Sequence, residues 1–128
     1  MSQENVDQVR AAFAAYNRGD LDAMIERFHP EVEFTTLLLG NHRGKEAIRR
    51  LFEENRATLP GHRLEPEEVI DAGDRVIAVV RIGGAGRVSQ IATEDRIAFL
   101  FTIKDGLTIR QQTLRNKKDA LEAAGLEE

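Results

Sequence analysis

The clearest pattern of hydrophobic and polar positions lies between residues 69 and 115, where it predicts four β-strands. Every second position from Ile97 to Ile103 is apolar, as expected when one face of a strand is buried. Asp105-Gly106 follows at once and predicts a two-residue hairpin turn, because both central residues of a type I′ turn have positive φ. We therefore expect a strand to either side of this turn.

Two further strands are predicted before this hairpin, one at Val69-Ile70 ahead of the turn Asp71-Ala72-Gly73-Asp74 and one over 76–82. Both phases of the segment 76–82 are largely apolar, so the sheet should have no fully wetted face there. A glycine-rich turn over 83–86 then leads into an extended segment that runs to Ile103. This segment is longer than a usual strand, and we expect a bulge or sharp bend between Ser89 and Arg96.

The first half of the chain changes to the period of an amphipathic helix. Apolar positions spaced by three and four residues predict a helix over 4–18. Asp20 is placed to cap a second helix that extends to Phe28 and is ended by Pro30. A short strand from Val32, a loop over 40–44, a third helix around 47–54 and a last helix over 119–124 complete the pattern. Early helices and late strands favour an α+β fold with an antiparallel sheet.

Length and composition limit the classes of function. The 128 residues fit one domain, 1–128. Acidic and basic residues are dispersed, with a net charge of −4, which argues against nucleic acid or an anionic membrane as partner. Cysteine is absent and the three histidines lack metal-ligand spacing, so we expect no thiol chemistry and no metal. The first residues contain no signal-peptide pattern, and we expect a cytoplasmic protein.

Five short motifs in order resemble one known family. They are Tyr16-Asn17-Arg18-Gly19-Asp20, His29-Pro30-Glu31-Val32-Glu33-Phe34, His42-Arg43-Gly44-Lys45-Glu46-Ala47-Ile48, Lys104-Asp105-Gly106 and Ala120-Leu121-Glu122-Ala123-Ala124-Gly125-Leu126. Together they resemble the SnoaL-like branch of the nuclear-transport-factor-two-like superfamily, which includes polyketide cyclases and relatives of ketosteroid isomerase.

This resemblance implies a cone-shaped α+β fold. A strongly curved mixed or antiparallel sheet would wrap around three N-terminal helices, with a short C-terminal helix at the end of the chain. The cone would open onto a mostly apolar pocket for a small apolar molecule, with no cofactor. The resemblance also implies a homodimer that packs through the outer face of the sheet. Because the same fold serves enzymes and non-enzymes, it does not decide the function.

The catalytic positions of characterised members carry different chemistry here. By motif alignment, the base, acid and tyrosine of ketosteroid isomerase fall near Thr36, Phe99 and Ala12. In limonene epoxide hydrolase, the acid of the last strand falls near Thr113, and its Arg-x-Asp falls near Val80-Arg81-Ile82. The resemblance therefore does not transfer either mechanism to this chain.

The remaining catalytic candidates are Asp95 and Tyr16. Without an intervening bulge, Asp95 shares the phase of Phe99 and faces the cavity, where burial would raise its pKa toward a value useful for proton transfer. A bulge could instead turn Asp95 to solvent, or Arg96 or Arg81 could pair with it. Tyr16 could donate to a substrate oxygen, or its ring could simply close the core between helix and sheet.

A set of side chains is expected to line the pocket. On the last strand, Gln111, Thr113 and Arg115 alternate on the side that should be concave, where polar groups need a partner, water or ligand. The full set of expected ligand-binding residues is Met24, Phe28, Phe34, Thr36, Phe99, Gln111 and Thr113.

Two hypotheses follow. In the first, the protein is a cyclase, isomerase or hydratase-type enzyme that acts by general acid–base catalysis on an apolar cyclic or polyketide-like substrate. Asp95 would transfer the proton, and Tyr16 or Gln111 would stabilise charge on oxygen. In the second, the protein is a non-catalytic ligand-binding or dimeric assembly domain, with the cone filled by side chains or a bound ligand.

Overall fold

The computed structural model of the chain describes residues 2–37, 40–58, 61, 63–83 and 96–126. The helices in this part of the chain are α1 (Ser2–Asn17), α2 (Leu21–Ile25), α3 (Lys45–Thr58) and α4 (Lys117–Ala123). The strands are β1 (Phe28–Thr35), β2 (Asn41–Arg43), β3 (Arg63–Ala72), β4 (Arg75–Gly83), β5 (Arg96–Lys104) and β6 (Leu107–Leu114). This arrangement confirms the predicted α+β fold.

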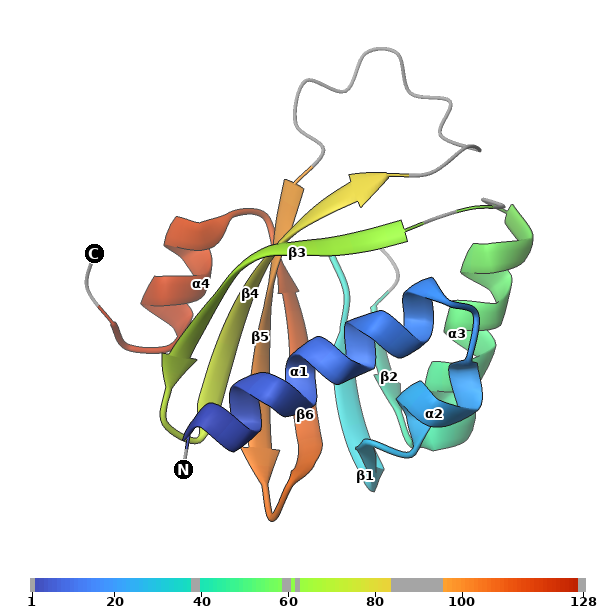
Figure 1. Ribbon diagram of the computed structural model, residues 1–128, viewed down its shortest axis with the longest axis horizontal. Helices are drawn as coiled ribbons and strands as arrows, with labels where there is room; N and C mark the ends of the chain where they lie inside the picture. Colours follow the sequence, from blue (N-terminus) through green and yellow to red (C-terminus); the bar gives the residue numbers. More distant parts are fainter. Residues whose placement is uncertain (1, 38–39, 59–60, 62, 84–95, 127–128) are drawn as a thin grey trace.

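The strands form one curved, open sheet in the order β2-β1-β6-β5-β4-β3 (Figure 1). All neighbouring strands are antiparallel except β1 and β6, which are parallel. The sheet is therefore mixed, in agreement with the cone implied by the family resemblance. The one parallel pair joins strands that are far apart in sequence, as parallel neighbours require a long connection.

Two hydrophobic clusters lie on opposite faces of the sheet. The larger cluster joins α1, α2 and α3 to the inner face, which includes Phe99 and Phe101 of β5. The smaller one places Leu121 of α4 against Ile77 and Leu100 on the outer face. Residues 77 and 100 alternate with the inward residues of their strands, so both phases of these strands are covered. The prediction that this region has no wetted face is confirmed, and α4 supplies part of the cover.

The hairpin between β5 and β6 has the predicted turn. Asp105 has φ 53° and Gly106 has φ 80°, so both central residues adopt the left-handed conformation that a type I′ turn needs. Asp105 is the one residue other than glycine with positive φ in the described part of the chain. The turn pairs Lys104 with Leu107, and a shift of one residue in β6 beyond Ile103 then places Phe101 opposite Gln111.

The end of the second helix was predicted wrongly. The helix ends at Ile25 instead of Phe28, and Phe28 already begins β1. Pro30 lies inside this strand, between Phe28 and Glu33, where the pairing of β1 with β6 is interrupted. A proline without an N–H group is tolerated at such an irregular position because no ladder hydrogen bond is lost there. The helix-like apolar spacing therefore continued past the true helix end.

Two strands were missed or shortened in the sequence prediction. β3 begins at Arg63, before the predicted start at Val69, and contains Pro66 next to a bulge. β3 is an edge strand, where proline is allowed. The predicted loop over 40–44 contains β2, whose three residues pair with β1. The bulge predicted between Ser89 and Arg96 falls largely outside the described residues, while β6 is irregular opposite Thr102 and Ile103.

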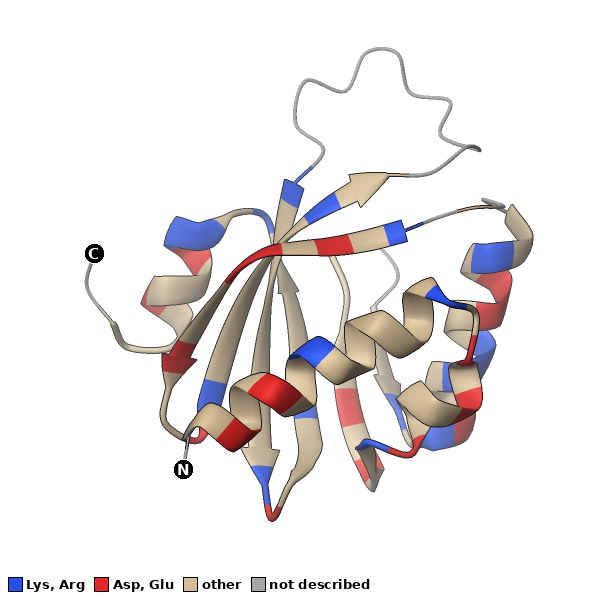
Figure 2. Cartoon of the chain, viewed as in Figure 1, with Lys and Arg blue, Asp and Glu red and all other residues tan. Residues whose placement is uncertain are grey.

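Charged side chains are frequent on α3 and along the edge strand β3 and are sparse on the central strands (Figure 2). Figure 2 shows acidic and basic residues along α3, whereas the central strands β4, β5 and β6 are almost free of charge along most of their length. Arg50, Glu53 and Glu54 of α3 are exposed, so these charges form a solvated face of the helix. No helix among the described residues is long and apolar enough to cross a membrane.

Candidate functional site

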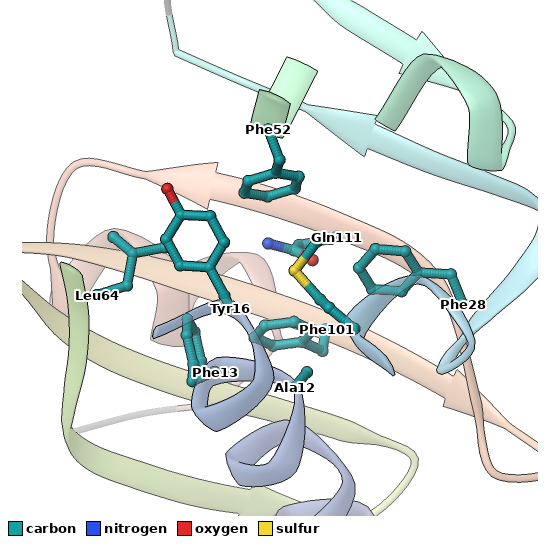
Figure 3. Close-up of a pocket in the computed structure, with 9 residues that line it drawn as sticks. Ala12, Phe13, Tyr16, Phe28, Phe52, Leu64, Phe101 and Gln111 are labelled. Atoms are coloured by element: carbon teal, nitrogen blue, oxygen red, sulfur yellow. The ribbon is translucent and has the colours of Figure 1, made fainter. Parts of the chain in front are cut away.

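A small inner cavity lies between α1 and the inner face of the sheet (Figure 3). Its volume is about 20 Å³, which is room for about one water molecule. Its walls are mostly aromatic and aliphatic, and they comprise Ala12, Phe13, Tyr16, Met24, Phe28, Phe52, Leu64, Phe101 and Gln111. The centre of the cone is therefore almost completely filled by side chains.

A larger apolar pocket lies beside the inner cavity. This apolar pocket has a volume of about 310 Å³. It is lined by Phe34, Thr36, Leu37, Leu51, Phe52, Asn55, Leu64, Ile82, Ile97, Phe99 and Thr113. Phe52 and Leu64 line both spaces, and these two side chains therefore separate the inner cavity from the apolar pocket.

The predicted ligand-binding residues divide between these two spaces. Met24, Phe28 and Gln111 line the inner cavity, and Phe34, Thr36, Phe99 and Thr113 line the apolar pocket. Each of these seven residues thus borders a cavity on the inner face. Their role in binding a ligand stays a prediction.

The motif alignment with ketosteroid isomerase correctly located wall positions. Thr36 and Phe99 border the apolar pocket and Ala12 borders the inner cavity. These positions are therefore close to the cavities, but none carries an ionisable side chain. Within the described residues, neither cavity is lined by Asp, Glu or His.

Asp95 lies outside the described residues, so the structure does not place this candidate. The two arginines suggested as partners of Asp95, Arg81 and Arg96, both lie beside Glu67. Arg96 donates to Glu67 at 2.6 Å, and Arg81 approaches the same carboxylate at 3.4 Å. Both arginines are exposed.

Arg115 was expected to continue the inward row of Gln111 and Thr113, but it does not. β6 ends at Leu114, and Arg115 is exposed and lies 3.7 Å from Asp119. The alternation therefore stops at the end of the strand, where the chain turns toward α4.

Tyr16 is buried at the boundary of the inner cavity. Its ring lies 5.2 Å from the ring of Phe52 and 4.9 Å from the guanidinium carbon of Arg56. Arg56 also donates to the backbone carbonyl of Tyr16 at 2.8 Å. In Figure 3 the Tyr16 hydroxyl lies at the end of the ring remote from Gln111.

Burial raises the pKa of the Tyr16 phenol, while the charge of Arg56 and a hydrogen bond from it act in the opposite direction. The phenol is therefore neutral near pH 7, where it could donate a hydrogen bond. Sequence reasoning found Tyr16 but missed Arg56, because Arg56 is on α3 and the sequence gives no signal that it reaches α1.

We expect Tyr16 to titrate above its ordinary pKa of 10.0 in the folded protein. The neutral phenol is the form that the fold stabilises, so this stability is lost as pH rises through the folded-state pKa. As the chain has one tyrosine, the ultraviolet absorbance of phenolate reports this residue alone. The urea-unfolded chain is the reference, and Arg56→Gln should raise the native pKa further. A native transition at or below the unfolded one would contradict the prediction.

Phe52, Leu64 and Phe101 are wall residues that sequence reasoning did not select. Phe101 shares the inward phase of Phe99, so the alternation of β5 could have identified it. Leu64 belongs to the first half of β3, which the sequence prediction did not include. Phe52 belongs to the buried face of α3, and only the packing of this helix shows that it borders both cavities.

The described residues contain no group of three Asp, Glu, His or Cys side chains that could hold a metal ion. The structure therefore offers no candidate metal centre in the regions that it describes. The polar groups on the two cavities are hydroxyls and amides, contributed by Tyr16, Thr36, Asn55, Gln111 and Thr113. Such groups can orient a neutral ligand through hydrogen bonds.

Comparisons with known proteins give consistent results. The model of the family described as SnoaL-like domain matches residues 9–111. A search among curated proteins finds no match to the chain.

Several solved structures share the fold. A protein from Sinorhizobium meliloti, provisionally described as a polyketide cyclase, is 26% identical, with a TM-score of 0.73 over 84% of this chain and 93% of that one. Bal32a, from a soil-derived mobile gene cassette, is 25% identical, with a TM-score of 0.76 over 88% of each chain. TerC, co-crystallised with polyporic acid, is 24% identical, with a TM-score of 0.71 over 94% of this chain and 97% of that one.

Proposed function

Because the chain belongs to the SnoaL-like domain family, we propose that it binds a small apolar molecule in the apolar pocket. The observation that carries this proposal is a space of about 310 Å³ with mainly aromatic and aliphatic walls. Binding sites for small molecules are typically of this kind, with a few polar groups that set orientation. Thr36, Asn55 and Thr113 provide such groups. The co-crystallisation of TerC with polyporic acid supports the same kind of role.

An enzymatic role is the further part of this proposal. The protein would act as a cyclase, isomerase or hydratase-type enzyme on an apolar cyclic or polyketide-like substrate, as the provisional description of the Sinorhizobium meliloti protein suggests. Tyr16, which is neutral near pH 7, would donate to a substrate oxygen, and Asp95 would transfer the proton. Asp95 lies outside the described residues, so its role stays a prediction, as does the cytoplasmic location.

The alternative is a non-catalytic ligand-binding or assembly domain. Two observations favour it: the inner cavity is only about 20 Å³, and neither cavity has a carboxylate wall residue in the described part of the chain. The enzymatic role and the non-catalytic ligand-binding role both require the apolar pocket to bind a ligand, whereas an assembly domain does not. The first test therefore concerns binding and not turnover.

Filling the apolar pocket should abolish binding of a neutral aromatic probe. We expect Thr113→Trp to weaken the binding of naphthalene by at least about tenfold, because the indole ring would occupy the space that the probe needs. Gln112→Trp is the matched control, since adjacent residues of a strand face opposite sides of the sheet. The measurement is displacement of a neutral fluorescent probe. Equal affinities of both variants and the unchanged protein would exclude this pocket as the site.

We also propose that the protein forms a homodimer through the outer face of the sheet. The apolar outer phase of β4 does not by itself require a second chain, because α4 covers Ile77. A groove of about 630 Å³ lies elsewhere on this face. We call it the outer-face groove, and its walls are His29, Glu31, Glu33, Arg75, Thr102, Lys104, Asp105, Leu107, Ile109 and Arg110.

The charges around the outer-face groove support pairing with a second copy. The acids Glu31 and Glu33 come from β1, whereas Arg75, Lys104 and Arg110 come from β4, β5 and β6, and one further acid, Asp105, lies in the turn after β5. A two-fold axis brings the same surface of two copies together, and it can place the acidic side of one groove against the basic side of the other. Leu107 and Ile109 supply apolar contact area between these charged side chains of the groove.

A further inference from the structure

The side chain of Gln111 is buried at the inner cavity, and its amide has no hydrogen-bond partner among the described residues. The one fully enclosed side-chain atom without a hydrogen bond in the described part of the chain is Nε of Arg27, so the Gln111 amide is not sealed off and opens onto the inner cavity. Gln111 is 4% exposed. It lines the inner cavity, and Figure 3 shows its amide among the rings of Tyr16, Phe28 and Phe101. Buried amides are nearly always hydrogen-bonded in folded proteins, so an unpartnered one requires an explanation.

The side chains around the Gln111 amide do not supply it with hydrogen bonds. The neighbouring wall residues Phe13, Met24, Phe28 and Phe101 are apolar. Among the described residues, the other polar wall group is the Tyr16 hydroxyl, which lies at the far end of its ring and interacts with Arg56. A single buried water usually needs two to four polar partners. The cavity is large enough for one water but offers essentially one amide to hold it.

We propose that Gln111 is the polar subsite of the ligand-binding site and accepts the hydroxyl or carbonyl end of a neutral, mainly aromatic ligand. This inference rests on the proposed binding function of the apolar pocket. The polar end of the ligand would enter the inner cavity, and its apolar body would remain in the apolar pocket. Displacing Phe52 or Leu64, which separate the two spaces, joins them into one site.

The chemistry of the subsite selects a neutral polar group. The glutamine amide offers an acceptor oxygen and two N–H donors, so a hydroxyl can both donate to it and accept from it. No Lys, Arg or His lines the inner cavity in the described part of the chain, and burial of a carboxylate there would leave its charge uncompensated. We therefore expect an alcohol, phenol or ketone to bind better than a hydrocarbon or a carboxylate of the same shape.

Three probes of one shape test this selectivity: naphthalene, 2-naphthol and 2-naphthoate. We expect the unchanged protein to bind 2-naphthol about tenfold more tightly than naphthalene, from one added buried hydrogen bond, and 2-naphthoate more weakly than either. Gln111→Met keeps the length of the side chain and removes the amide, so the preference for 2-naphthol should disappear. Gln112→Met, on the opposite side of the sheet, should retain it.

The stability of the ligand-free variant gives a second, independent readout. Replacing an unpartnered amide by an apolar group of similar shape should raise the midpoint of urea unfolding, because a desolvated polar group is removed. A lower midpoint for Gln111→Met would show that Gln111 has a structural partner and would overturn the proposal. A preference for 2-naphthol that survives in Gln111→Met would also overturn it.

The same probes separate the subsite from the binding function itself. If naphthalene binds and Thr113→Trp abolishes this binding, but 2-naphthol is not preferred, then the Gln111 subsite is wrong and the apolar pocket remains the binding site. If neither naphthalene nor 2-naphthol binds to the unchanged protein, both proposals fail.

Discussion

Replacing Phe52 by alanine is expected to lower the free energy of unfolding by about 3–5 kcal/mol and to join the inner cavity to the apolar pocket. The first effect follows from the loss of a large buried ring and the space that it leaves. Phe52 is 6% exposed and packs against the rings of Tyr16 and Phe34, at 5.2 Å and 5.7 Å between ring centres. The loss is a large part of the total stability of a typical domain, about 5–15 kcal/mol.

The second effect concerns the size of the ligand. Because Phe52 is a wall of both spaces, its removal should shift the preference of the protein toward longer aromatic probes. Urea unfolding measures the stability, and competition between naphthalene and 2-phenylnaphthalene measures the preference. The longer probe should gain about tenfold relative to naphthalene, from its larger buried apolar surface.

Phe28→Ala is the matched control for this experiment. Phe28 is 3% exposed and lines the inner cavity but not the apolar pocket. Its replacement should therefore cost a similar free energy of unfolding without opening the apolar pocket. If both variants change the preference for probe length equally, Phe52 does not separate the two spaces.

Placing a carboxylate in the outer-face groove is expected to dissociate the proposed dimer. Ile109 is half-buried in one chain and lies between strands that carry the complementary charges of this groove. An Ile109→Asp substitution would bury an unpaired charge at the interface, at a cost of about 3 kcal/mol. The dissociation constant of the dimer should therefore rise by about a hundredfold.

Light scattering at micromolar protein concentration measures this change. The unchanged protein should have twice the mass of one chain, and Ile109→Asp should have the mass of one chain. Leu37→Asp is the control, because Leu37 is 46% exposed and belongs to the apolar pocket instead of the outer-face groove. A single-chain mass for the unchanged protein would contradict the dimer, and a dimeric Ile109→Asp would exclude this face as the interface.

The sequence identified the elements whose signals are local. Alternation from Ile97 to Ile103 and the Asp105-Gly106 turn located β5, β6 and their hairpin, because strand alternation and turn conformation depend on neighbouring residues. It failed at Pro30, which was interpreted as the end of a helix although it lies in β1, and it missed the first half of β3, which contains Pro66. Whether proline is tolerated depends on bulges and strand edges, and these are known only when the strands have been paired.

The candidate site was likewise predicted from the sequence only where the signals are local. The order of the motifs and the inward phase of β6 placed Gln111, Thr113 and Phe99 on the concave face from the sequence alone. Only the tertiary structure showed that Phe52 and Leu64 split the concave space into a small inner cavity and a larger apolar pocket. Local periodicity determines which way a side chain points from its own element. The volume that remains between elements depends on how side chains from α1, α3 and the sheet fill it together, and no single segment of the sequence contains that information.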